Sequence, residues 1–386
     1  MAPSGANRPA KITSDSGKMP SETPAVEKHP APLTTGSLLA RFAGIGVLLL
    51  GVLGAFLYLG GWFSPDKLTP ARFVDEFERV GGIHSGFRRN HAKGVCIRGF
   101  FESNGQGARL SKAVVFQSGR VPVIGRFSLG GGDPHTTDVL STVRGLGLQF
   151  SLSDGEQWRT AMVDLPVFPL KDPQAFYDNL VASQPDPNTH KPDPAKGAAF
   201  LASHPETARA LAIIKSHAPS SGFDNAAYYG LNAFRFVNAD GATTYVRWTL
   251  VPVQPSETGA GAGQDANQDK NFLFDGLISS IHQHPLQWHL IMTVAQPGDT
   301  TDDATLPWPE GREQVDVGML TLDSVESEET SPARDINFDP LVLPAGMSPS
   351  NDPLLSARSA IYSQSFTRRA GETKEPSAIT PSEVQK

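Results

Sequence analysis

The chain has 386 residues and a formal net charge of −7, and hydrophobic residues make up 39% of it. This length suits one large folded domain with appendages. A nucleic-acid-binding surface needs clustered lysine and arginine, and no such cluster stands out in this sequence. The single cysteine, Cys96, excludes an intramolecular disulfide framework and every motif that requires two cysteines.

The N-terminal region combines a polar tail with an apolar stretch. Residues 1–36 are rich in Pro, Ser, Thr and Ala, a composition that predicts a disordered tail. Residues 42–63 carry no charge, and a helix of this length, rising about 1.5 Å per residue, crosses the roughly 30 Å hydrocarbon core of a bilayer. The sequence therefore predicts a transmembrane helix at 37–63 that contacts the lipid bilayer through residues 42–63. A cleaved signal peptide is the alternative, but it has a shorter apolar stretch and a small-residue cleavage site.

The charges on either side of the apolar stretch predict its orientation. The segment before it, residues 1–41, is net positive, and the segment after it, residues 64–83, is net negative. The more positive flank usually stays in the cytoplasm. We therefore expect a single-pass protein of the inner (cytoplasmic) membrane, with a cytoplasmic N-terminus and a large domain on the periplasmic, outward-facing side.

The rest of the chain is predicted to alternate short strands with helices. This pattern favours an α+β architecture built on an antiparallel β-barrel with inserted helices, which we assign to one domain, residues 64–370. Residues 371–386 are polar and are predicted to form a disordered tail. The strands are expected at 113–117, 121–127, 145–152, 160–163, 234–237, 243–252, 288–296 and 313–323, and the helices at 70–81, 172–182, 205–217, 271–284 and 355–369.

One face of the last predicted helix carries residues suited to binding iron. Arg358 and Tyr362 are one helical turn apart, and Arg369 is close to three turns beyond Arg358. An arginine beside a tyrosine favours the charged phenolate, which can serve as an axial iron ligand. The same spacing also fits an ordinary exposed helix face, so the pattern alone leaves both interpretations open.

The residues around this face resemble the proximal-ligand region of catalases, and upstream segments resemble further motifs of that family in the same order. The chain is therefore identified as a member of the catalase superfamily over roughly residues 70–370, and it is most similar to the small catalase-related haem peroxidases. The matching segments are Arg88–Gly94, Gly99–Glu102, Gly125–Ser128, Val143–Gly145, Phe150, Trp158, Pro166–Phe168, Asp172–Pro173, Phe176, Gln184–His190, Phe234–Gly241, Asn337–Pro340, Pro344–Gly346, Ser348–Pro349, Asp352, Leu355 and Arg358–Tyr362.

The resemblance implies a non-covalently bound haem b in a pocket inside the barrel, and it gives each candidate residue a role. His91 would be the catalytic acid and base that moves a proton between the two oxygens of hydrogen peroxide. Ser128 would hydrogen-bond the other ring nitrogen of His91. Tyr362 would be the iron ligand, kept anionic by Arg358. The other residues expected around the haem are Arg88, Arg126 and Arg369, which would pair with the propionates or support the ligand, and Phe176, which would pack near the haem face.

Several positions depart from the family pattern. Where catalases carry a distal asparagine, counting back from Pro166 places Val163, and a shift of one residue would place Asp164. Valine offers no hydrogen-bond donor to bound peroxide, and Asp164 would donate only if protonated, or would point into solvent. Thr142 and Gly130 stand where typical catalases have an acidic channel residue and a bulkier, valine-like one, which predicts a wider access route.

These departures favour a peroxidase that reduces hydrogen peroxide, and organic peroxides as a further option, with an organic electron donor and with weak catalase activity. A true catalase, a hydroperoxide-rearranging enzyme and a non-catalytic haem-binding protein are the alternatives. Because the sequence lacks the long N-terminal arm and the large C-terminal domain that interlock classical catalases as tetramers, we expect a monomer or a homodimer.

Overall fold

The structure is a computed structural model that describes residues 34–60, 68–255 and 270–385. The chain divides into two compact units, Met1–Pro65 and Asp66–Lys386, which are treated separately below. This division lies next to the expected boundary between a membrane segment and a folded domain. Most of the predicted tail at 1–36, and residues 61–63 of the predicted membrane helix, lie outside the described residues.

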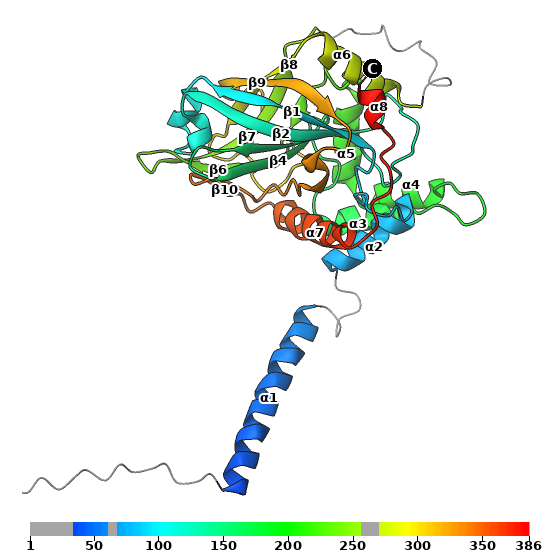
Figure 1. The fold of residues 1–386 in the computed structure, drawn as a ribbon, viewed down its shortest axis with the longest axis vertical. Coiled ribbons are helices and arrows are strands. Elements are labelled where there is room, and N and C mark those ends of the chain that lie inside the picture. Colours follow the sequence, from blue (N-terminus) through cyan, green and yellow to red (C-terminus); the bar gives the residue numbers. More distant parts are fainter. Residues whose placement is uncertain (1–33, 61–67, 256–269, 386) are drawn as a thin grey trace, which may run out of the picture. The chain divides into compact units, whose positions relative to one another are not determined.

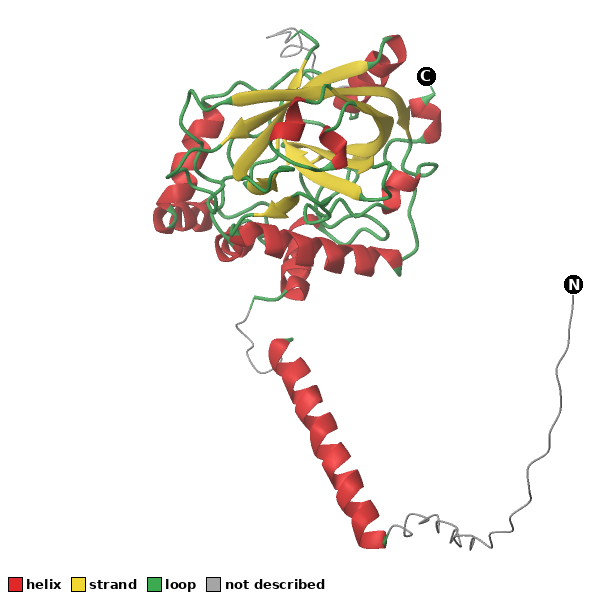
Figure 2. Cartoon of the chain, turned by 90° about the vertical axis from the view of Figure 1, so that its left-hand side faces the viewer, coloured by secondary structure: helices red, strands yellow, loops and turns green. Residues whose placement is uncertain are grey.

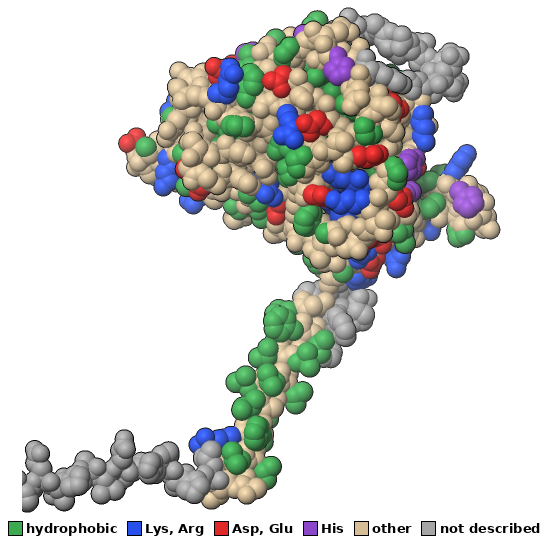
Figure 3. Space-filling model, viewed as in Figure 1, with side chains coloured by type: hydrophobic (Ala, Val, Ile, Leu, Met, Phe, Trp, Pro, Cys, Tyr) green, Lys and Arg blue, Asp and Glu red, His purple; other side chains and the backbone are tan. Residues whose placement is uncertain are grey.

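The first unit contains a single described helix, α1 (Thr35–Leu59), which begins two residues earlier than predicted. The side chain of Thr34 caps it by accepting a hydrogen bond from the backbone N–H of Ser37. Apolar side chains cover the helix, and none of them is buried (Figure 3). Among the described residues this is the one helix long and apolar enough to cross a membrane, although a signal sequence near the N-terminus has the same length and composition.

The second unit is built on a closed antiparallel β-barrel of eight strands (Figures 1 and 2). Around the barrel the order is β1-β2-β3-β4-β5-β7-β8-β9, and β9 pairs with β1 to close it. Two short strands, β6 and β10, extend the sheet from β7. The strands are β1 (Gly94–Ser103), β2 (Gly119–Leu129), β3 (Arg144–Ser151), β4 (Gln157–Val163), β5 (Tyr228–Tyr229), β6 (Phe234–Val237), β7 (Thr243–Pro252), β8 (Leu286–Val294), β9 (Gln314–Glu326) and β10 (Met347–Pro349). The prediction of an antiparallel barrel with inserted helices is confirmed.

Large aromatic side chains fill the inside of the barrel. Along β4, Trp158 and Met162 are buried and alternate with less buried residues, as expected when successive side chains point to opposite faces of a strand. The ring of Trp158 stacks on Phe150 at 4.6 Å between centroids and meets Trp248 edge-on at 5.3 Å. Protein interiors are packed as densely as organic crystals. These rings therefore form a hydrophobic core that fills the barrel interior.

Three helices form a layer against one side of the barrel: α2 (Pro70–Gly81), α3 (Pro173–Ala182) and α7 (Pro353–Ala370) (Figure 1). Each begins with proline at its first position, preceded by a side chain that accepts a backbone hydrogen bond, a combination that favours helix initiation. These capping residues are Thr69, Asp172 and Asp352. The local sequence therefore fixes where all three helices begin.

The remaining elements show where the sequence-based predictions were incomplete. The strand predicted at 113–117 is wrong, because Val114–Phe116 form a short 3-10 helix, η2. The sequence analysis also missed strand β1 and helix α4. The other elements are α4 (Pro194–Ser203), α5 (Pro205–Lys215), α6 (Phe272–Gln283), α8 (Pro381–Val384), η1 (Gln106–Arg109) and η3 (Pro332–Asp335).

The C-terminal segment differs from the disordered tail predicted for 371–386. Ile379 and Val384 are buried in the main hydrophobic core, and the hydroxyl of Ser327 donates a hydrogen bond to the Ile379 carbonyl. Thr380 and Glu383 form a capping box that starts the short helix α8. Two apolar side chains within an otherwise polar stretch are therefore enough to attach this segment to the domain.

We predict that Ile379→Ala lowers the free energy of unfolding by about 2–4 kcal/mol, because it removes a buried aliphatic side chain and leaves a cavity. The exposed neighbour Glu375 provides the matched control, and Glu375→Ala should change the free energy by less than about 0.5 kcal/mol. Chemical denaturation of both variants measures the difference. Equal stability of the two variants would show that the segment is not attached to the core.

Candidate active site

A pocket lies between the outer face of the barrel and the helix layer. Its barrel wall is formed by one end of β2, β3 and β4, and its opposite wall is formed largely by α7. Ser128, Gly145 and Val163 pair across these strands and line the pocket. The residues beside them, Phe127, Leu146 and Met162, belong to the barrel core, and Leu146 and Met162 also border the pocket. The expectation of a pocket inside the barrel is therefore wrong, because aromatic side chains occupy the interior.

His91 reaches the pocket from the loop before β1, in a left-handed backbone conformation with φ of 57°. Its Nδ1 lies 3.1 Å from the hydroxyl oxygen of Ser128, and that hydroxyl donates to the Gly145 carbonyl at 3.5 Å. When Nδ1 of His91 carries the ring proton, it donates to the Ser128 hydroxyl, and Nε2 is then the basic nitrogen.

Glycine is required at position 145. A Cβ atom there would lie 2.8 Å from both Nδ1 of His91 and the hydroxyl oxygen of Ser128, closer than side-chain atoms approach. Gly130 is different, because a Cβ there would meet Val143 at 3.4 Å and His91 at 4.0 Å. A Cβ at position 130 would therefore make ordinary van der Waals contacts, so the space beside His91 does not by itself require glycine there.

Burial is the main reason why His91 resists protonation. Together with the positive charges of Arg126, Arg358 and Arg88, it lowers the pKa of His91 to about 4. The imidazole is consequently neutral at ordinary pH. A neutral imidazole with a free Nε2 lone pair can accept a proton from a ligand in the pocket.

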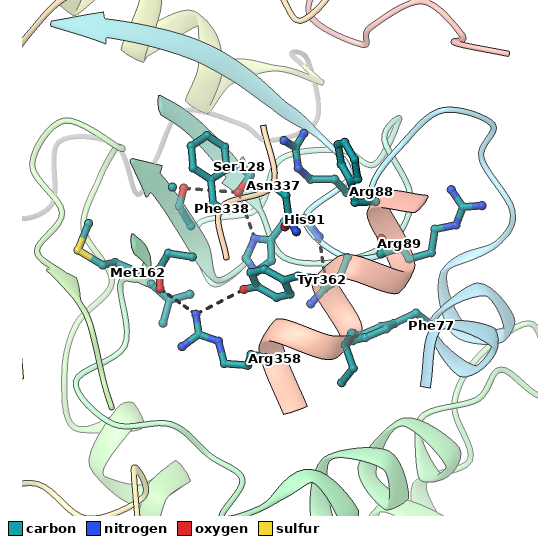
Figure 4. Close-up of a pocket in the computed structure, with 18 of the residues that line it drawn as sticks. Phe77, Arg88, Arg89, His91, Ser128, Met162, Asn337, Phe338, Arg358 and Tyr362 are labelled. Atoms are coloured by element: carbon teal, nitrogen blue, oxygen red, sulfur yellow. Dashed lines mark hydrogen bonds between the residues drawn. The ribbon is translucent and has the colours of Figure 1, made fainter. Parts of the chain in front are cut away.

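The facing wall presents Tyr362 from helix α7. Nη2 of Arg358, one turn earlier, lies 3.4 Å from the phenol oxygen and also donates to the Ala161 carbonyl at 2.9 Å. Nη1 of Arg358 donates to Oδ1 of Asn232 at 2.7 Å, and Nδ2 of Asn232 donates to Asp352 at 2.8 Å. Arg358 is therefore held by partners on β4 and on the loop before β6, and it lies beside Tyr362 in the pocket (Figure 4).

Positive charge is concentrated around the pocket. Of the described residues that line it, five are arginines and none is Asp or Glu. Burial lowers the pKa of Arg369 to about 10, and burial followed by Arg126 and Arg369 lowers the pKa of Arg88 well below its ordinary value. Guanidinium groups stay charged in proteins, so this pocket favours an anionic ligand. The five arginines are Arg88, Arg89, Arg126, Arg358 and Arg369.

Six phenylalanines contribute to the apolar part of the pocket. Phe176 of α3 meets Phe73 and Phe77 of α2 edge-on, with centroids 5.2 and 5.7 Å apart. Phe338 lies over Gly147, where a Cβ would come within 2.8 Å of its ring. A flat apolar group with acidic substituents matches this combination of aromatic walls and buried arginines. The pocket also brings together all eight site residues named from the sequence: Arg88, His91, Arg126, Ser128, Phe176, Arg358, Tyr362 and Arg369.

Val163, and not Asp164, faces the pocket. Val163 lines it, whereas Oδ1 of Asp164 accepts a hydrogen bond from the Arg144 backbone N–H at 2.8 Å and Oδ2 pairs with the Arg144 guanidinium at 3.2 Å. Burial raises the pKa of Asp164, although the contacts with Arg144 oppose this. The strict count from the sequence therefore holds. Asp164 is neither a distal donor nor a solvated strand residue.

The sequence analysis missed the residues that support the site. Asn232 follows Leu231, whose φ is 64°, and nothing in the local sequence signals its contact with Arg358, more than a hundred positions later. Glu328 stands in an acidic Glu-Ser-Glu-Glu run typical of an exposed loop, yet it is only 3% exposed. Asn90 accepts hydrogen bonds from the backbone of His91 and Gly131. These contacts depend on the fold.

Comparisons with known proteins agree with this geometry. The sequence is 37% identical over 333 residues to a catalase-related peroxidase of Synechococcus elongatus, a match that covers 86% of this chain and 95% of the relative. It is 32% identical over 306 residues to a catalase-related peroxidase of Mycolicibacterium paratuberculosis, covering 79% of this chain and 96% of the relative. Both relatives are matched over nearly their whole length.

Solved structures support the same fold. A bacterial catalase superimposes with a TM-score of 0.66 at 22% identity, covering 75% of this chain and 58% of that protein. Catalase A of Saccharomyces cerevisiae superimposes with a TM-score of 0.67 at 20% identity, covering 75% of this chain and 62% of that protein. The chain thus spans about 60% of the length of these solved catalases. The sequence matches the model of the catalase family over residues 74–379, and the chain therefore belongs to the catalase family.

Proposed function

We propose that this protein is a haem-dependent peroxidase that reduces hydrogen peroxide with an organic electron donor and has little catalase activity. The observation that carries this proposal is one pocket that combines a neutral, oriented His91, a tyrosine–arginine pair and Val163 at the distal position. The two catalase-related peroxidases matched over nearly their whole length support the same activity.

The residues present fit a non-covalent haem, which we take to be haem b. Tyr362 would bind the iron, with Arg358 favouring its phenolate, and Phe176 would lie near the macrocycle. Arg369 is buried and Arg88 is half-buried, and both are positively charged, which suits them to the two propionates. When bound, the haem supplies the iron that activates peroxide and stores its oxidising equivalents.

The protein's own contribution to peroxide reduction is proton transfer at His91. Nε2 would take the proton from one peroxide oxygen and return it to the other, which then leaves as water. Ser128 holds the tautomer that makes Nε2 the acceptor. The aromatic walls exclude bulk water, which strengthens the electrostatic effect of the surrounding arginines.

Val163 favours peroxidase over catalase chemistry. Disproportionation requires a second peroxide to be bound and oxidised, and an amide donor at this position would help to hold it. Valine has no donor, and Asp164 is paired with Arg144 outside the pocket. The oxidised enzyme is therefore left for reduction by an organic molecule.

The decisive experiment compares oxygen release with oxidation of a phenolic dye by the haem-loaded protein. We expect dye oxidation with little oxygen, and we expect Val163→Asn to raise oxygen release severalfold because it adds an amide donor. Val163→Leu is the matched control, since it changes the side chain at the same position without adding a donor. Stoichiometric oxygen release by the unaltered protein would instead identify a true catalase.

The acid limit of activity should report on His91. Because the pKa of His91 is lowered to about 4, its proton-accepting form persists as the pH falls from 7 to 5. We predict a constant initial rate of peroxide reaction over that range and a fall only as the pH approaches about 4, measured by stopped flow. A loss of rate centred near 6.5 would mean that His91 titrates as an exposed histidine.

We also propose that α1 anchors the protein in the inner membrane, with the N-terminus in the cytoplasm and the haem domain in the periplasm. Its length, its apolar surface and the charges flanking it support this proposal. The intact protein should stay in the membrane fraction after alkaline extraction and keep its full mass, and protease should digest the haem domain in spheroplasts. A soluble product lacking α1 would identify a cleaved signal sequence.

A further inference from the structure

A buried carboxylate lies behind the arginines of the pocket. Glu328 follows β9 and is 3% exposed. Its Oε1 accepts a hydrogen bond from Nε of Arg126 at 2.7 Å, and its Oε2 accepts one from Nη2 at 3.1 Å. Oε1 also accepts from Nη1 of Arg88 at 3.1 Å. This paired contact fixes one edge of the Arg126 guanidinium in position and orientation.

The other edge of Arg126 holds the backbone of the histidine loop. Nη1 donates to the His91 carbonyl at 2.8 Å, and Nη2 donates to the Ala92 carbonyl at 2.8 Å. Gly94 leaves room for this contact, because a Cβ there would overlap the guanidinium. Arg126 therefore connects Glu328 to the segment that carries His91, and most of its donors are engaged before any ligand binds.

This connection acts where the backbone is strained. With φ of 57°, His91 occupies a left-handed conformation that side chains larger than glycine rarely adopt, and such residues persist only when their surroundings hold them. The side chain of Asn90 accepts a hydrogen bond from the His91 backbone N–H, and Arg126 donates one to the His91 carbonyl. Relaxation of the backbone would turn the imidazole away from its position beside Ser128.

We propose that Glu328 is a positioning residue for His91, acting through Arg126 to hold the histidine loop in its left-handed conformation. The inference rests on the proposed role of His91 as proton acceptor. Glu328 is suited to this task because, although burial opposes its ionisation, Arg126 and Arg88 hold its pKa below the ordinary value. Both of its oxygens consequently act as charged acceptors.

Cyanide association tests the proposal without any need for turnover. Hydrogen cyanide must lose its proton as it binds ferric haem, so its association rate reports on His91. In the haem-loaded full-length protein we expect Glu328→Gln to slow association by about tenfold or more, with haem content unchanged. In a His91→Ala background the same substitution should cause no further slowing, because Glu328 acts through His91.

A matched control separates positioning from general loss of stability. Asp299 forms a partly exposed ion pair with Arg312 at 2.7 Å outside the pocket lining, and Asp299→Asn should leave cyanide association unchanged. If Glu328→Gln fails to fold, cyanide association is measured instead for Glu328→Asp, alone and combined with His91→Ala. It keeps the charge but shortens the reach to Arg126, so slower association that depends on His91 is again expected.

Two outcomes would overturn the proposal: a wild-type association rate in the Glu328 variants, or an equal slowing with and without His91. The second would assign Glu328 a structural role alone. Cyanide binding needs no electron donor. A protein that oxidises no dye, but in which Glu328→Gln slows cyanide association only when His91 is present, would contradict the proposed peroxidase function and leave this inference intact.

Discussion

Buried positive charge is the constraint on which the site depends. The described lining of the pocket contains five arginines and no carboxylate, and carboxylates behind the lining pair with four of them: Glu328 with Arg88 and Arg126, Glu78 and Glu372 with Arg89, and Asp335 with Arg369. An uncompensated charge in an apolar environment costs a large amount of free energy. Among the described residues Arg358 makes no ion pair with a carboxylate, so the phenolate of Tyr362 beside it would supply a compensating negative charge.

The two walls of the pocket come from elements that are rigid for different reasons. The wall that carries Ser128 and Gly145 belongs to a closed barrel whose interior is filled with aromatic side chains. The wall that carries Tyr362 is a helix fixed at its start by a side-chain cap and by contacts with α2 and α3. His91 and Arg88 stand on the loop before β1, and the side chains of Asn90 and Arg126 hydrogen-bond the backbone of that loop at His91 and Ala92.

The sequence predicted the barrel, most of its strands and all eight candidate site residues, because motif order and helical spacing are local properties. It failed where a property depends on long-range packing. The polar segment after residue 371 is attached to the domain through Ile379 and Val384. Glu328 stands in an acidic stretch that suggests an exposed loop, although its side chain is buried. The position of the pocket outside the barrel follows from which face of β2 to β4 the aromatic core occupies, and no single strand contains that information.

The function proposed for the pocket depends on Tyr362, which would bind the haem iron. Resonance Raman spectroscopy of the haem-loaded full-length protein tests it directly, because a phenolate bound to ferric iron gives vibrations of its own. The account predicts these vibrations in the unaltered protein and in His91→Ala, and their loss in Tyr362→Phe. Their absence from the unaltered protein, or their persistence in Tyr362→Phe, would contradict it.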